Sequence, residues 1–150
     1  MNFRHLAIVF LLLLNHLFGQ EIRVSDDLVL HKLSENCFVH TQSNNNGLIY
    51  INNGEAIIVS TPDSDIETQN LINWVIDEKH AKIVGYIIDR WHPDAMGGLD
   101  IVQINGIKSY SYELTRKIAK EKSLPIPKNG FDPQKVIKVG GEKVICHFLG

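Results

Sequence analysis

The sequence has little cysteine and proline and no excess of positive charge. Two cysteines in 150 residues exclude a disulfide-dense miniprotein and a zinc site made of four thiolates. Five prolines and 11 glycines are too few for a collagen-like repeat or for a chain that is disordered throughout. A formal net charge of −2 provides no basic surface for nucleic acid. The remaining composition, with 44% hydrophobic residues, is that of one globular domain with its own core.

The longest apolar run lies at the N-terminus and is too short for a membrane span, which needs about 20 residues. Arg4 and His5 precede the apolar residues 6–14, and the small residue Gly19 follows them. This order of charge, apolar core and small residue predicts a secretory signal peptide over residues 1–19, with a retained membrane anchor as the alternative. After cleavage we expect a mature chain that has no membrane association and works in an oxidising compartment.

Short apolar strands alternate with helices along the mature chain, which predicts an α/β fold made of α+β layers. Ser64 and Glu67 have the spacing of a helix capping box, so a helix is expected from there to about residue 79. Ser111 is expected to cap another helix that ends near residue 122 and turns Leu114 and Ile118 inward. The predicted strands cover residues 22–24, 28–33, 37–41, 48–51, 56–59, 82–88, 108–110, 136–139 and 144–149, with a turn at 43–47.

The densest group of reactive side chains falls in residues 89–98, which are predicted to form a polar loop directly after a buried strand. A loop at the carboxyl end of a strand is the favoured place for a site in an α/β layer fold. His92 offers an imidazole and Asp94 a carboxylate, and both are types of zinc ligand. Two glycines at the end of the loop would let the backbone approach closely. Taken alone, this one His-x-Asp pair fits a pair of metal ligands or an ordinary polar loop.

The remaining reactive side chains are given structural roles. Cys37 and Cys146 lie in strand-like apolar runs and are expected to be buried free thiols, although a disulfide between them is possible in an oxidising compartment. Trp74 is expected in the core and Trp91 beside the site loop. The histidines outside this loop are expected to be structural or to lie on the surface; those considered are His31, His40, His80 and His147.

Several blocks of the sequence, taken in order, resemble metallo-β-lactamases of subclass B1, and especially the Bacteroides-type zinc enzymes. The blocks are residues 46–50, 56–62, 67–74, 91–99, 109–111, 119–127, 130–131 and 146–150. The resemblance implies an αββα sandwich, of which residues 20–150 form a partial domain, the N-terminal half, with the C-terminal half missing. It also implies a periplasmic monomer that uses Zn²⁺ to hydrolyse the β-lactam ring of small-molecule antibiotics, and so a role in antibiotic resistance. Zinc in such enzymes polarises a carbonyl and makes hydroxide available near neutral pH.

The ligand positions of the family are only partly matched. In its His-x-His-x-Asp loop, His92 and Asp94 match the second His and the Asp, so the resemblance implies both as metal ligands and Asp94 as the catalytic residue. Arg90 occupies the position of the first ligand His, and its guanidinium has no lone pair to donate to a metal. Ser60 stands where the family usually has an Asp. Of the six ligands expected in the family, two are present, Arg90 replaces one, and the remaining three are expected beyond Gly150. We therefore expect weak or absent zinc binding, because catalytic zinc sites have three protein ligands.

Three functions remain open at this point. The first is a zinc β-lactamase that is impaired or inactive in this chain. The second is a non-catalytic relative that kept the fold and binds a ligand or partner. The third is a hydrolase of the same superfold that acts on another ester or thioester, since a fold does not fix its substrate.

Overall fold

The structure, a computed structural model, describes residues 21–43 and 45–149. It contains an eight-stranded sheet in which the strands follow one another in sequence order, and a separate two-stranded hairpin. The predicted signal peptide lies outside the described residues. Within them, no helix is long and apolar enough to cross a membrane. The strands are β1 (Glu21–Arg23), β2 (Leu28–Lys32), β3 (Cys37–Gln42), β4 (Asn45–Asn52), β5 (Glu55–Val59), β6 (Lys82–Ile88), β7 (Ser109–Tyr112), β8 (Asn129–Phe131), β9 (Gln134–Val139) and β10 (Glu142–His147).

The alternation of apolar and polar residues predicts the first five strands, and the structure pairs them as an antiparallel meander. The turn predicted at residues 43–47 is shorter than expected, because β4 already begins at Asn45 and pairs it with Gln42. Gly47 explains the difference, since it lies under the imidazole of His40 in a place where any Cβ would overlap the ring. The strand can therefore continue through residues that the sequence pattern assigns to a turn.

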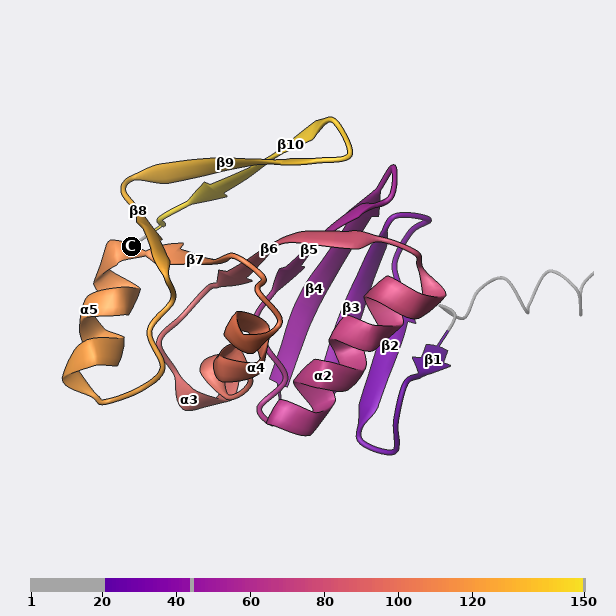
Figure 1. Cartoon of the computed structure of the whole chain (residues 1–150), viewed down its shortest axis with the longest axis horizontal. Coiled ribbons are helices and arrows are strands. Elements are labelled where there is room, and N and C mark those ends of the chain that lie inside the picture. The colour runs from indigo at the N-terminus through magenta and orange to yellow at the C-terminus, as the bar shows by residue number, and fades with distance from the viewer. Residues whose placement is uncertain (1–20, 44, 150) are drawn as a thin grey trace, which may run out of the picture.

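From β5 to β8 the strands are parallel, and helices connect them (Figure 1). The connections contain α2 (Asp65–Asn73), the π-helix η1 (Trp74–Glu78), α3 (Pro93–Met96), α4 (Leu99–Ile104) and α5 (Glu113–Glu121). Parallel strands end at the same edge of a sheet, so the segments that follow β5, β6 and β7 are brought together at one edge. The predicted α/β layer fold is confirmed.

The helix predicted from Ser64 begins there. The Ser64 hydroxyl accepts a hydrogen bond from the Glu67 backbone N–H, as an N-cap does. The second half of the predicted capping box is absent, because the Glu67 carboxylate instead accepts a hydrogen bond of 2.6 Å from the Ser25 hydroxyl. Helical structure continues through η1 to Glu78. Trp74 is buried and packs edge-on against Phe38 with the ring centroids 5.3 Å apart, as predicted.

The last helix, α5, differs from its prediction. Ser111 does not cap it, because this residue belongs to β7 and pairs with Gly130 of β8. The helix consequently begins one residue later than a Ser111 cap would place it, with Tyr112 at the N-cap position. Its buried residues also lie one position further along the sequence than predicted, which corresponds to a rotation of about 100° around the helix axis. Leu114, predicted to be inward, is 45% exposed, and α5 buries Thr115 and Ala119 instead.

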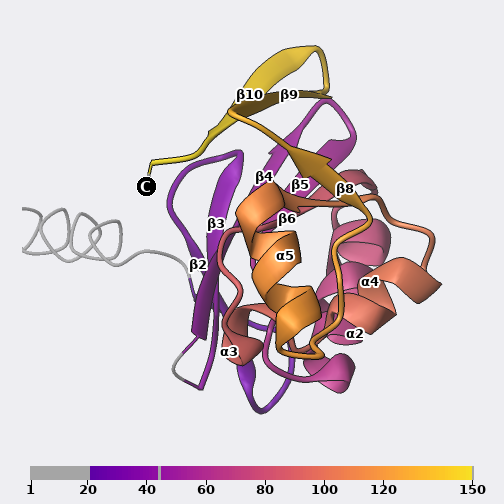
Figure 2. The same ribbon diagram turned by 90° about the vertical axis from the view of Figure 1, so that its left-hand side faces the viewer.

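The two faces of the sheet carry separate apolar clusters. One face packs against the helices and holds the larger cluster, which includes Leu30, Ile58 and Leu71. The hairpin β9–β10 lies away from the helices (Figure 2) and packs Ile137 and Val139 against the other face.

The two cysteines are free thiols, as expected, but they are partly exposed where burial was predicted. Cys37 lies on β3 and Cys146 on β10 of the hairpin. Partial burial raises the pKa of both thiols, because it disfavours the charged thiolate.

Candidate functional site

The site predicted at residues 89–98 follows β6 at the edge of the sheet where the parallel strands end. The sequence predicts a polar loop there, but the segment contains the one-turn helix α3. Pro93 favours the start of this short helix, because its φ is fixed at a helical value. It also lacks a backbone N–H, which would have no partner within the helix at that position. The extended residue His92 precedes the helix, and Asp94 lies in its first turn.

The guanidinium of Arg90 lies between two carboxylates. Its Nη1 donates to Asp89 Oδ2 at 2.9 Å, and its Nη2 donates to Asp94 Oδ2 at 2.7 Å. Nη2 also donates to the side-chain oxygen of Asn45 at 3.2 Å. The Arg90 side chain is 35% exposed, so these interactions are partly shielded from water. One positive charge thus holds two negative ones.

The two predicted metal ligands lie close together. His92 Nδ1 is 4.0 Å from Asp94 Oδ1, while the other carboxylate oxygen of Asp94 accepts the bond from Arg90. That bond is the main reason why the pKa of Asp94 is held below its ordinary value. The His92 ring packs edge-on against Trp91, with centroids 4.6 Å apart, and the ammonium of Lys122 lies 4.5 Å from the centre of the Trp91 ring. Trp91 therefore lies beside the site loop, as expected.

Residues from neighbouring strand ends hold this loop in place. Asn45, at the start of β4, donates through its side-chain amide to the backbone oxygens of Thr61 and Asp94. Ser60, directly after β5, donates its hydroxyl to Asp89 Oδ1. Sequence reasoning missed the role of Asn45, which fell inside a predicted turn and carried no signal of its own. Asp89 had one signal, namely its position directly after a buried strand.

The two glycines at the end of the loop permit the close approach that the sequence predicts. A Cβ on Gly97 would overlap the backbone of Asp63, and one on Gly98 would overlap the side chain of Thr68. The loop is thereby packed against the start of the connection between β5 and β6.

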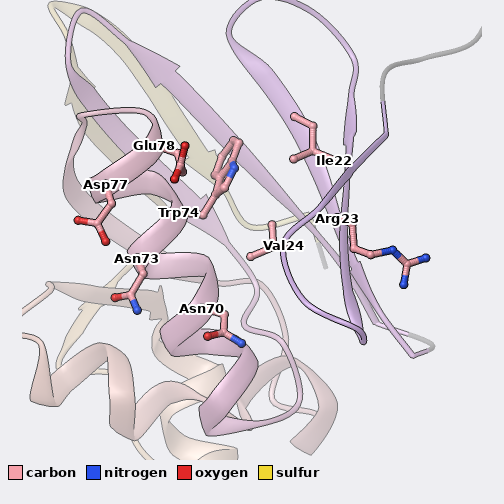
Figure 3. A pocket seen from close by; sticks show the side chains of 8 residues that line it. All are labelled: Ile22, Arg23, Val24, Asn70, Asn73, Trp74, Asp77 and Glu78. Carbon is pink, nitrogen blue, oxygen red and sulfur yellow. The ribbon is translucent and has the colours of Figure 1, made fainter.

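A groove of about 400 Å³ lies elsewhere, between β1 and the helical segment α2–η1. Ile22 and Val24 line it from the strand side and Trp74 from the helix side (Figure 3). Arg23, which lies between Ile22 and Val24 in the sequence, also lines it. The residues of the site loop do not line this groove, so it is separate from the candidate site.

The residues of the site do not fit a zinc centre. Over residues 21–43 and 45–149, no group of three or more His, Cys, Asp or Glu side chains is arranged to hold a metal ion. Arg90 contacts the one carboxylate that the family pattern assigns to zinc, and a fixed positive charge there repels a divalent cation. The role of His92 and Asp94 as metal ligands therefore stays a prediction.

Comparison with known proteins agrees with the fold and with the resemblance. No family model matches the chain. It is 35% identical over 140 residues to the metallo-beta-lactamase type 2 of Bacteroides fragilis, covering 87% of this chain and 56% of that protein. It is 32% identical over 104 residues to the corresponding protein of Pseudomonas aeruginosa, covering 63% of this chain and 42% of the relative. The chain thus spans about half the length of the curated relatives it matches.

Solved structures give the same result. The metallo-beta-lactamase from Pontibacter korlensis superposes with a TM-score of 0.75 at 25% identity, covering 81% of this chain and 60% of that one. The DIM-1 metallo-beta-lactamase gives a TM-score of 0.71 at 28% identity, covering 81% and 57% of the two chains. The fold is therefore the metallo-β-lactamase fold, over the part that the chain spans. Over the part that it spans, the chain is similar in sequence and in fold to metallo-β-lactamases, as the sequence predicts.

Proposed function

We propose that this chain carries part of the framework of a zinc-dependent β-lactam hydrolase, and that hydrolysis is lost or strongly reduced in its present sequence. The similarity to metallo-β-lactamases in sequence and fold supports the first part. One observation carries the second, the 2.7 Å bond from Arg90 to Asp94. In zinc hydrolases the metal polarises the substrate carbonyl and lowers the pKa of a bound water. Here a guanidinium, which cannot donate a lone pair, contacts the carboxylate that this chemistry needs.

The remaining properties of the chain follow from the same proposal. The substrate class is a small-molecule β-lactam, with His92 and Asp94 at the ligand positions. A secretory signal over residues 1–19 would direct the protein to the periplasm as a monomer, where β-lactam hydrolysis gives antibiotic resistance. The net charge of −2 favours no nucleic-acid partner.

The bonds around Arg90 also favour a second candidate, a non-catalytic relative that binds a ligand without turning it over. A site whose carboxylates are already bound by a fixed cation keeps its shape but lacks the groups that activate water. Equilibrium dialysis of the chain against an intact β-lactam tests the second candidate. Binding without ring opening supports this candidate, and the absence of binding contradicts it.

Hydrolysis of a chromogenic cephalosporin by the purified chain tests the proposal directly. We expect no turnover above buffer, with or without added zinc. Robust turnover that a chelator abolishes would show that the site is active and that the proposed loss is wrong.

The reverse substitution tests the cause. In the Bacteroides fragilis relative, Arg is introduced at the position that aligns with Arg90. We expect kcat/KM for the cephalosporin to fall by at least about a hundredfold, because removing one catalytic interaction costs about 10² to 10³ in rate. An unchanged kcat/KM would show that this position does not limit hydrolysis.

A further inference from the structure

We propose that Arg90 is the resident cation of this site, and that its guanidinium ties the loop of residues 89–98 to the sheet edge without any metal ion. This goes beyond the proposed loss of hydrolysis, because it assigns Arg90 a positive structural role. It also predicts that the loop is formed and stable in metal-free solution.

The geometry of the guanidinium carries the first step. Arg90 reaches Asp89 and Asp94 with two different nitrogens, at 2.9 Å and 2.7 Å. A planar guanidinium presents its donors in a fixed fork, so binding two carboxylates at once also fixes their relative position. A bound divalent cation fixes carboxylates in the same manner, by charge and by short contacts.

The second step is that both aspartates are also held by residues at neighbouring strand ends, Asp89 through its carboxylate and Asp94 through its backbone oxygen. The Asp89 carboxylate accepts a hydrogen bond from the Ser60 hydroxyl at the end of β5. The Asp94 backbone oxygen accepts one from the side-chain amide of Asn45 at the start of β4. The side-chain oxygen of the same Asn45 accepts a hydrogen bond from Arg90. The guanidinium therefore joins the ends of β4, β5 and β6 to the first turn of α3 in one connected network.

The charges carry the third step. Without Arg90, the carboxylates of Asp89 and Asp94 would face the same space with no cation between them, and like charges at that range repel. With Arg90 in place, one oxygen of Asp89 and one of Asp94 accept hydrogen bonds from its guanidinium. Among residues 21–43 and 45–149, no group of three or more His, Cys, Asp or Glu side chains is arranged to hold a metal ion. A divalent ion at these carboxylates would have to displace a cation that is covalently part of the chain.

The unmodified chain provides the first test. Its thermal midpoint is measured with a chelator, without additions and with one and five equivalents of Zn²⁺, and Co²⁺ binding is followed by visible absorption. We expect the midpoint to move by less than about 1 °C and no d–d band of a protein-bound Co²⁺. A stoichiometric metal that raises the midpoint by about 3 °C or more, and is lost in His92→Ala, would overturn the proposal.

Substitution of Arg90 provides the second test, read locally by hydrogen exchange of peptides covering residues 89–98. We expect Arg90→Gln to speed exchange in this loop by about tenfold, since opening then no longer breaks the network. Arg90→Lys is expected to give an intermediate rate, because it keeps the charge but loses the fork.

Arg116→Gln is the matched control. Arg116 is similarly exposed and binds both carboxylate oxygens of Glu113 at 3.0 Å, but it lies on α5. Exchange in the loop should be unchanged in this variant. If Arg90→Gln leaves loop exchange as slow as Arg116→Gln does, the guanidinium does not hold the loop. If Arg90→Gln fails to fold, Arg90→Lys and the metal titration of the unmodified chain still decide the question.

Discussion

At the residue scale, a buried histidine lies close to the site. His40 is fully buried in β3, and its Nε2–H donates to the Ser60 carbonyl at 3.1 Å. Its Nδ1 has no hydrogen-bond partner among the described residues. Burial lowers the pKa of His40 to about 4, because the charged imidazolium is poorly solvated there. The sequence expectation of a structural role fits this geometry.

The His40 environment predicts an acid-sensitive fold. The pKa is about 4 in the folded chain and 6.5 when unperturbed, so the unfolded chain binds the proton more tightly. The contribution of the neutral His40 imidazole to the free energy of unfolding is fully present above pH 6.5 and is lost as the pH falls to about 4. It amounts to about 3 kcal/mol of unfolding free energy. Urea unfolding at pH 7.5, 5.5 and 4.5 measures it.

The carboxylates also titrate in this range, so the unmodified chain is compared with two variants. His40→Gln should flatten the pH dependence, whereas His31→Gln, at a partly exposed position of β2, should not. If the free energy of unfolding falls with pH in the same way in all three chains, His40 does not control the pH dependence of stability. A His40 pKa above 6 by NMR titration would lead to the same conclusion even if His40→Gln does not fold.

The sequence indicated which loop carries the candidate site residues, but not the hydrogen bonds that join them to neighbouring strands. His92 and Asp94 were placed in one loop by sequence spacing, and the structure brings them close together. Arg90 was recognised as a poor metal ligand from its chemistry alone. Its contact with Asn45 joins positions 45 residues apart, and only the folded sheet brings these together. No local pattern encodes such a contact.

At the scale of elements, strands and capped helices were predictable where the local signals agreed. The strands of the meander followed from period-two alternation, whereas their pairing order did not, and the start of α2 followed from Ser64. The start of α5 was not predictable, because the pairing of Ser111 with Gly130 competes with a capping role for that serine. The early start of β4 likewise depends on the packing of Gly47 under His40. In both cases a tertiary contact overrides a local preference.

The cap of α2 predicts a measurable loss when it is removed. Ser64→Ala deletes the acceptor for the Glu67 backbone N–H, which lies 3.3 Å away. The expected cost is about 1 kcal/mol of unfolding free energy. Ser64→Asp should keep most of the stability, because a carboxylate also caps and suits the positive end of the helix dipole. Chemical denaturation of the three chains gives the comparison, and equal stability of Ser64→Ala and the unmodified chain would show that the cap is dispensable.

At the scale of the whole molecule, the sheet is stabilised from both faces. The helices bury one face in the larger cluster, and the β9–β10 hairpin buries part of the other through Ile137 and Val139. Asn52 and Asn53 donate to the backbone of Gly140, and Glu55 accepts from its N–H. The hairpin is thus attached by apolar packing and by hydrogen bonds at its tip.

This attachment predicts that the hairpin unfolds together with the sheet. Ile137→Ala removes a side chain that is 7% exposed and should cost about 2 to 3 kcal/mol of unfolding free energy. Ile145→Ala, on the paired strand but 50% exposed, should cost less than about 1 kcal/mol. Circular dichroism and tryptophan fluorescence should give one coincident transition in each chain. An earlier, separate loss of strand signal would show that the hairpin unfolds independently.

The positions of the two tryptophans give the molecule two built-in optical probes. Trp74 is enclosed in the core beside Phe38, so its emission follows the integrity of the whole fold. Trp91 is partly exposed at the site loop, between the imidazole of His92 and the ammonium of Lys122. Both groups can quench the fluorescence of an indole. Replacing one indole at a time with phenylalanine would let spectroscopy distinguish rearrangement of the loop from melting of the interior without any attached dye.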